Sequence, residues 1–83
     1  MKQFARTSKD IGHAIRQARK AQNLTQKDLA VRSGVWQETI SKIETGVAST
    51  KLETVFALLA ALDLELQVQP RSKGSQADLE DIF

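Results

Sequence analysis

Three times in this 83-residue chain a threonine is followed, three residues later, by an acidic residue. The pairs are Thr7 with Asp10, Thr25 with Asp28, and Thr50 with Glu53. This spacing is typical of the capping box, in which a threonine oxygen and an acidic side chain satisfy free backbone N–H groups where a helix begins. The chain is therefore divided into short helices, and we predict an all-α fold.

Apolar residues recur at helical spacing after each of these starts. The pattern predicts helices over about residues 8–22, 26–32 and 37–45, and a fourth that follows Thr50 and ends near residue 62. Gly34 separates the second helix from the third because glycine readily adopts the positive φ that a sharp turn needs. The fourth helix holds six large apolar residues in eleven positions, more than the face of one small core requires.

The segment from Leu64 to Gln69 alternates strictly between apolar and polar residues, and Pro70 ends it. Such alternation predicts a short half-buried β-strand. The sequence offers no second strand, and an unpaired strand exposes a row of backbone groups. We therefore expect the strand to pair with the same strand of a second copy. The predicted interface of this homodimer joins the strand to apolar residues of the fourth helix: Phe56, Leu59, Leu62, Leu64, Leu66 and Val68.

Charge is distributed unevenly along the chain. Residues 1–51 carry a net charge of +6 and residues 52–83 a net charge of −4, which leaves +2 for the whole chain. A basic half indicates a polyanionic partner such as nucleic acid. A basic surface that is merely solvated explains the charge as well, so the positions of the charges must decide.

The composition argues against an enzyme. The chain has one histidine, no cysteine, no tyrosine and no glycine-rich phosphate loop. We expect His13 on an exposed helix face rather than as a catalytic base. Asp78, Glu80 and Asp81 could suggest a cation site, but they more simply keep the chain end solvated. No apolar run approaches the ~18–20 residues of a membrane span. We predict no cofactor, no metal and no membrane partner.

Two short helices joined by a glycine turn form a helix-turn-helix, whose second helix enters the major groove of DNA. On the third predicted helix, Ile40, Ile43 and Glu44 share one face. The opposite face and the helix start are polar, with residues that suit base edges: glutamine bonds adenine, lysine bonds guanine and glutamate accepts from cytosine. This polar set is Gln37, Glu38, Ser41, Lys42 and Thr45.

The stretch LTQKDLAVRSGVWQETISKIETG, from Leu24 to Gly46, resembles the helix-turn-helix of the XRE group, which includes phage Cro proteins and repressors. The resemblance extends from about Ile11 to Leu62. It implies a lambda-repressor-like, four-helix helix-turn-helix domain, here followed by the one short C-terminal strand. It further implies a sequence-specific transcriptional repressor of double-stranded DNA that binds a palindromic operator as a homodimer.

The same resemblance implies roles for individual residues. Base contacts fall to Gln37, Glu38, Ser41 and Lys42. Contacts to the DNA backbone fall to Thr25, Gln26, Trp36, Thr39 and Thr45. A structural ion pair is implied between Arg19 and Glu44, since Glu44 lies on the inward face of the third helix.

Trp36 departs from the family, which usually has serine or threonine as the N-cap at this position. A cap contributes about 1 kcal/mol. Trp36 either packs on the neighbouring helix or lies against a sugar or a thymine methyl group.

A helix followed by an alternating strand and a loose tail is similar to HipB-type antitoxins. That resemblance implies a HipA-type serine/threonine kinase toxin as partner, an operon that the complex represses, and a bacterial cytoplasmic protein that is nucleoid-associated when bound to its operator. The alternatives are a free-standing XRE-family repressor and a restriction–modification controller protein. A protein-interaction module without DNA binding would explain the apolar excess but not the basic half.

We divide the chain into an N-terminal arm (residues 1–7), a DNA-binding and dimerisation domain (residues 8–70) and a disordered tail (residues 71–83). The tail is polar, yet it ends in an apolar cluster of Leu79, Ile82 and Phe83. This cluster could anchor the tail on the toxin. A frayed chain end and a degradation tag are the alternatives.

Overall fold

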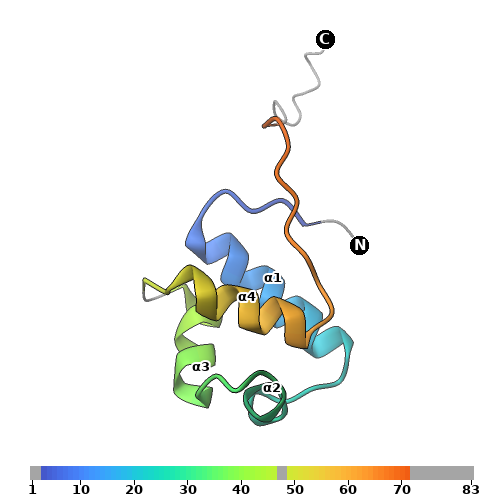
Figure 1. Cartoon of the computed structure of the whole chain (residues 1–83), viewed down its shortest axis with the longest axis vertical. Helices are drawn as coiled ribbons and strands as arrows, with labels where there is room; N and C mark the ends of the chain where they lie inside the picture. The colour runs from blue at the N-terminus through green and yellow to red at the C-terminus, as the bar shows by residue number, and fades with distance from the viewer. Residues whose placement is uncertain (1–2, 47–48, 72–83) are drawn as a thin grey trace.

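The computed structural model describes residues 3–46 and 49–71 and contains four α-helices (Figure 1). They are α1 (Ser8–Ala21), α2 (Gln26–Ser33), α3 (Gln37–Thr45) and α4 (Leu52–Ala61). The predicted all-α, four-helix architecture is confirmed. The ends of α1 and α2 differ by one residue from those expected, and α3 has the predicted bounds.

Two of the three predicted helix starts are capped as expected. At α2 the hydroxyl of Thr25 accepts from the backbone N–H of Asp28 at 3.0 Å, and the Asp28 carboxylate accepts from the N–H of Thr25 at 2.9 Å. At α1 the hydroxyl of Thr7 accepts from the N–H of Asp10 at 3.1 Å. The Asp10 carboxylate accepts from the N–H of Arg6 instead of Thr7, so this capping box is only half formed.

The third predicted start is wrong by one residue. The N-cap of α4 is Lys51, and no side-chain hydrogen bond caps the helix. The carbonyl of Lys51 accepts the first bonds of the helix, from the N–H groups of Thr54 and Val55. Glu53 therefore lies two residues after the cap and not three, so the spacing from Thr50 does not define the start.

Two helices end at a residue with positive φ that is not glycine. Asn23 follows α1 and Asp63 follows α4, each with φ of 60°. Behind Asp63, the N–H of Leu64 donates to the carbonyl of Leu59 at 2.8 Å, which closes the last turn as a Schellman motif. Asparagine and aspartate tolerate this conformation better than other non-glycine residues. The chain consequently turns sharply away from both helices.

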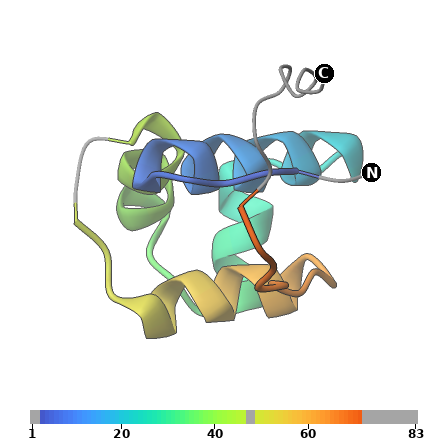
Figure 2. The same cartoon turned by 90° about the horizontal axis from the view of Figure 1, so that it is seen from above.

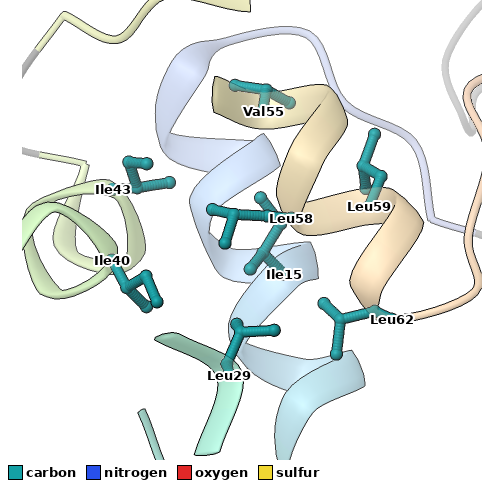
Figure 3. Close-up of a cluster of buried hydrophobic side chains, with 8 residues drawn as sticks. All are labelled: Ile15, Leu29, Ile40, Ile43, Val55, Leu58, Leu59 and Leu62. Carbon is teal, nitrogen blue, oxygen red and sulfur yellow. The ribbon is translucent and has the colours of Figure 1, made fainter. Parts of the chain in front are cut away.

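The helices pack around one small apolar core. Figure 2 shows α1 and α4 on opposite sides of the domain, and α3 packs against α1 while α2 packs against both α3 and α4. All four helices contribute buried apolar side chains, which converge in Figure 3. These residues are Ile15, Leu29, Ile40, Ile43, Val55, Leu58, Leu59 and Leu62.

The predicted β-strand is not formed within one chain. Residues 64–70 have neither helix nor strand structure and extend away from the helices (Figure 1). A strand requires a partner for its backbone groups, and the part of the chain that the structure describes supplies none. Pairing with a second copy therefore stays a prediction.

A buried ion pair joins α1 to α3. The guanidinium of Arg19 contacts both carboxylate oxygens of Glu44, with its Nε 2.7 Å from Oε2 and its Nη2 2.9 Å from Oε1. The side chains are only 9% and 1% exposed. Arg19 also donates to the carbonyl of Leu24 at 2.8 Å, at the turn that leads into α2. The predicted pair is present, and it fixes three helices relative to one another.

Gly12 allows α1 and α3 to approach closely. A Cβ atom added at Gly12 would lie 1.9 Å from the carbonyl oxygen of Ile43 and 2.9 Å from its carbonyl carbon. Both atoms belong to the backbone, so no side chain can move aside. The helix pair therefore requires a residue without a side chain at this position.

We expect Gly12→Ala to destabilise the domain by about 1–3 kcal/mol, because the helices must separate to admit the methyl group. The gain in helix propensity from glycine to alanine, roughly 0.5–1 kcal/mol, offsets only part of that cost. Urea unfolding followed by circular dichroism measures the difference. His13→Ala, at the exposed neighbouring position, is the matched control. Equal stability of the two variants would show that the close approach is not required.

We expect Arg19→Ala to lose about 3–5 kcal/mol, because Glu44 keeps its buried charge without its cation. The measurement is the melting temperature, with Arg16→Ala, an exposed arginine of the same helix, as control. The double variant Arg19→Met with Glu44→Leu removes both charges and should be close to wild type in stability. A melting temperature for Arg19→Ala equal to that of Arg16→Ala contradicts a structural role of the pair.

Candidate nucleic-acid interface

The two helices α2 and α3 are joined by a tight turn at Gly34. This glycine has φ of +78°, as predicted, and its N–H donates to the carbonyl of Ala30 at 2.9 Å. The hydroxyl of Ser33 accepts from the N–H of Val35 at 3.1 Å, which fixes the chain on the far side of the turn. Short helices joined in this way have the form of a DNA-binding helix-turn-helix.

The faces of α3 divide as the sequence predicts. Ile40, Ile43 and Glu44 are buried against the other helices. Of the predicted base-contacting residues, three are exposed and one is half-buried. The exposed side chains are Gln37, Glu38 and Lys42, and the half-buried one is Ser41. The exposed edge of α3 thus combines neutral, acidic and basic groups over less than two turns, a mixture able to distinguish base edges.

Gln26, the predicted phosphate ligand, is tied to the buried ion pair. Its Nε2 atom donates to Oε1 of Glu44 at 3.1 Å. Since a carboxylate only accepts, this bond orients the amide of Gln26 with its nitrogen toward Glu44. The second N–H of that nitrogen is left to donate to a group outside the protein. The sequence did not reveal this bond, because it joins side chains of two helices, α2 and α3, that are 18 residues apart.

The threonines predicted at the DNA backbone differ in what they can donate. The exposed hydroxyl of Thr25 accepts from its own helix, which leaves its proton for an external oxygen. The hydroxyl of Thr45 instead donates to the carbonyls of Ser41 at 3.1 Å and Lys42 at 3.0 Å. While it does so, Thr45 has no proton for a phosphate. Thr39 is half-buried on α3.

Hydrogen bonding shifts the pKa of two charged groups of the site in the direction that favours their ionised form. The bond to Glu44 raises the pKa of Arg19 further above its already high ordinary value, against the opposing effect of burial. The hydrogen bond from the backbone N–H of Thr25 lowers the pKa of Asp28 below its ordinary value. Asp28 is anionic at neutral pH, and its charge interacts favourably with the positive end of the helix dipole at the start of α2.

Trp36 does not pack on a neighbouring helix. It is the N-cap of α3, it makes no side-chain cap hydrogen bond, and it is 81% exposed. Of the two environments that the sequence left open, burial among the helices is excluded.

The residues predicted for the dimer interface divide into two groups. Leu59 and Leu62 are buried in the core of a single chain, so they lie beneath the surface on which a second copy could pack. The others are accessible on the surface of one chain: Phe56, Leu64, Leu66 and Val68. The predicted tail anchor of Leu79, Ile82 and Phe83 lies outside the described residues.

A shallow groove lies beside these exposed apolar residues. Residues 3–6 of the arm and 63–71 of the C-terminal segment line it together, with Ile11 of α1. No pattern in the sequence indicated that the two ends of the domain line one groove. Within residues 3–46 and 49–71, no group of three metal-ligating side chains is found, and no helix is long and apolar enough to cross a membrane.

The family model HTH_3, described as helix-turn-helix, matches residues 15–69. The uncharacterised HTH-type transcriptional regulator y4dL of Sinorhizobium fredii is 37% identical over 68 residues, which cover 82% of this chain. The chain spans only 35% of the length of that regulator. Antitoxin HipB of Escherichia coli O6:H1 is 32% identical over 75 residues, covering 84% of this chain and 80% of the antitoxin.

Solved structures agree with these matches. HipB in the HipB–O4 20mer complex superposes with a TM-score of 0.77 and 29% identity, over 83% of this chain and 97% of that one. A chain of the HipA–HipB–O2–O3 complex gives a TM-score of 0.76 and 29% identity with the same coverage. The chain therefore belongs to the helix-turn-helix family and is a DNA-binding transcriptional regulator of the XRE type.

Proposed function

We propose that this protein is a sequence-specific repressor that binds a palindromic operator as a homodimer and serves as the antitoxin of a HipA-type kinase. The observation that carries the DNA-binding part is the exposed polar edge of α3, held in a fixed position by the buried pair of Arg19 and Glu44. A recognition helix whose frame is rigid can present its side chains to base edges without ordering itself first.

In the proposed complex, the exposed edge of α3 reads the bases. Gln37, at the start of the helix, suits the two hydrogen-bonding groups of adenine, and Lys42 suits the acceptors of guanine. Glu38 can accept from the amino group of cytosine, while Ser41 can bond to either kind of edge. Together they give the complex its sequence preference.

The backbone contacts surround this edge. Gln26 and Thr25, at the start of α2, each retain a proton that can be donated to a phosphate oxygen. Thr39 and Thr45 belong to the same proposed set, although Thr45 must first release its bond to the helix carbonyls. Phosphate contacts of this kind position the protein and carry no sequence information.

The homodimer of the proposal uses the exposed apolar residues of the C-terminal segment. Leu64, Leu66 and Val68 would face the second copy, with Phe56 of α4 beside them. A two-fold dimer would present two recognition helices to major grooves one turn, about 34 Å, apart. That arrangement requires an operator with inverted half-sites.

The antitoxin role rests on the similarity to HipB, including HipB in a complex with HipA. We propose the corresponding partner here, a HipA-type serine/threonine kinase. A gene for such a kinase beside the gene for this chain would favour the antitoxin over a free-standing repressor. The tail residues Leu79, Ile82 and Phe83 stay the proposed anchor on that partner.

We expect Gln37→Ala to weaken binding to a preferred duplex by about 1–3 kcal/mol and to relax the preference at one base position. The duplex is selected by the wild-type protein from a pool of random sequences, and affinities are measured by fluorescence anisotropy of the labelled DNA. Gln26→Ala should instead weaken binding to the selected and to a random duplex alike, because a phosphate is the same in every sequence.

The two outcomes separate readout from positioning. If Gln37→Ala reduces the affinity for the selected duplex and for the random duplex by the same factor, Gln37 does not read a base. Because Gln26 also bonds to Glu44, the melting temperature of Gln26→Ala is measured as well, and affinities are compared where both proteins are folded.

We expect Leu66→Lys to give monomers and to abolish tight operator binding, since a charge would enter the apolar interface of the second copy. Sedimentation measures the mass. Gln67→Lys is the matched control, because adjacent side chains of a strand point to opposite faces, so Gln67 would point away from the interface that Leu66 enters. A dimer mass retained by Leu66→Lys would contradict the proposed pairing of the segments.

A further inference from the structure

Trp36 is unfavourable for the free protein in two respects. As the N-cap of α3 it offers no oxygen, because an indole only donates, and no side-chain bond caps the helix. Capping residues are serine, threonine, aspartate and asparagine for this reason. In addition, one of the largest apolar side chains of the protein is left 81% exposed to water. Neither helix formation nor core packing explains the residue.

Its position places Trp36 at the proposed interface with DNA. It directly precedes Gln37, and the N-terminal residues of a recognition helix are those that approach base edges. In the major groove the apolar group on a base edge is the C5-methyl of thymine. Docking of α3 in the major groove would remove this exposed aromatic ring from water.

We propose that Trp36 is an apolar anchor of the DNA interface, and that its indole ring packs against a thymine C5-methyl group in the major groove. The inference rests on the proposed function and adds a specificity to it: one operator position at which thymine is preferred over cytosine and over uracil. The contact is made only in the complex, where the indole ring and the thymine methyl group are both removed from water.

The chain provides its own probe for this contact. Trp36 is the only tryptophan and tyrosine is absent, so the intrinsic fluorescence excited in the indole band comes from Trp36 alone. In the free protein the exposed ring should be quenched strongly by acrylamide. We expect quenching by acrylamide to fall severalfold when the selected duplex is bound, with binding itself followed independently by anisotropy of the labelled DNA. Bound DNA with unchanged quenching overturns the proposal and leaves the proposed function standing.

Replacing thymines of the selected duplex one at a time by deoxyuridine removes a methyl group and no hydrogen-bonding group. At one position we expect the wild type to lose about fourfold in affinity, the equivalent of one buried methyl. Trp36→Ala should be insensitive to the same replacement. If the wild type and Trp36→Ala lose the same affinity at every replaced position, the proposal is overturned. It is also overturned if DNA shields the ring from acrylamide but no thymine methyl affects affinity, which is the result expected when the ring packs on a sugar.

Trp36→Ser distinguishes an anchor from a structural residue. Serine restores a capping oxygen, so we expect a higher melting temperature together with an affinity for the selected duplex that is lower on the order of tenfold. Val31→Ala is the matched control, since Val31 is equally exposed at 81% and lies on α2 outside the proposed contacts. A Trp36→Ser protein that binds as tightly as Val31→Ala overturns the proposal. Absence of DNA binding by the wild type itself would refute the proposed function first.

Discussion

The bidentate pair of Arg19 and Glu44 is the contact on which the position of the recognition helix depends. Two charges withdrawn from water are tolerated only when their hydrogen bonds are satisfied. Here Glu44 accepts from Arg19 twice and from Gln26 once, while Arg19 also bonds to the carbonyl of Leu24. Apolar residues of similar volume could hold the helices together as strongly. The ion pair differs from apolar contacts because it is directional: both of its hydrogen bonds form at only one rotation of α3 about its own axis. Gly12 acts on the same two helices by setting their separation at Ile43, so rotation and distance are fixed by different residues.

How far the sequence predicts this structure depends on the range of each interaction. The starts of α1 and α2 were predictable because a threonine bonds a backbone group three residues away. The same spacing failed at Thr50, since Lys51 is the N-cap of α4 and no side chain caps the helix. The bond between Gln26 and Glu44 and the close approach at Gly12 are tertiary. A glycine within a helix was the one local sign of the latter. The alternation at residues 64–69 predicts a strand that a single chain does not form, and pairing with a second copy stays a prediction.

The apolar excess of α4 has a simple distribution. Val55, Leu58 and Leu59 point into the core that Figure 3 shows, and Leu62 closes it below the end of the helix. Leu52 and Phe56, one turn apart, are left exposed on another face. The expectation that the helix carries more apolar surface than one core needs is therefore met by these two residues. Leu59 and Leu62, which the sequence assigned to the dimer interface, are buried within one chain, because periodicity identifies an apolar face without stating which molecule covers it.

The residues that build the frame and those proposed to read DNA are separate sets along one helix. Ile40, Ile43 and Glu44 bind α3 to the rest of the domain, while Gln37 and Lys42 are exposed to solvent in the free protein. Changes in the exposed set alter what the helix can bond to without changing its position, because surface substitutions cost little stability. This separation is compatible with a fold shared with HipB at 29% identity and a TM-score of 0.77. In the proposed complex, the shared frame would set where DNA is contacted, and the exposed side chains of α3 would set which bases are preferred.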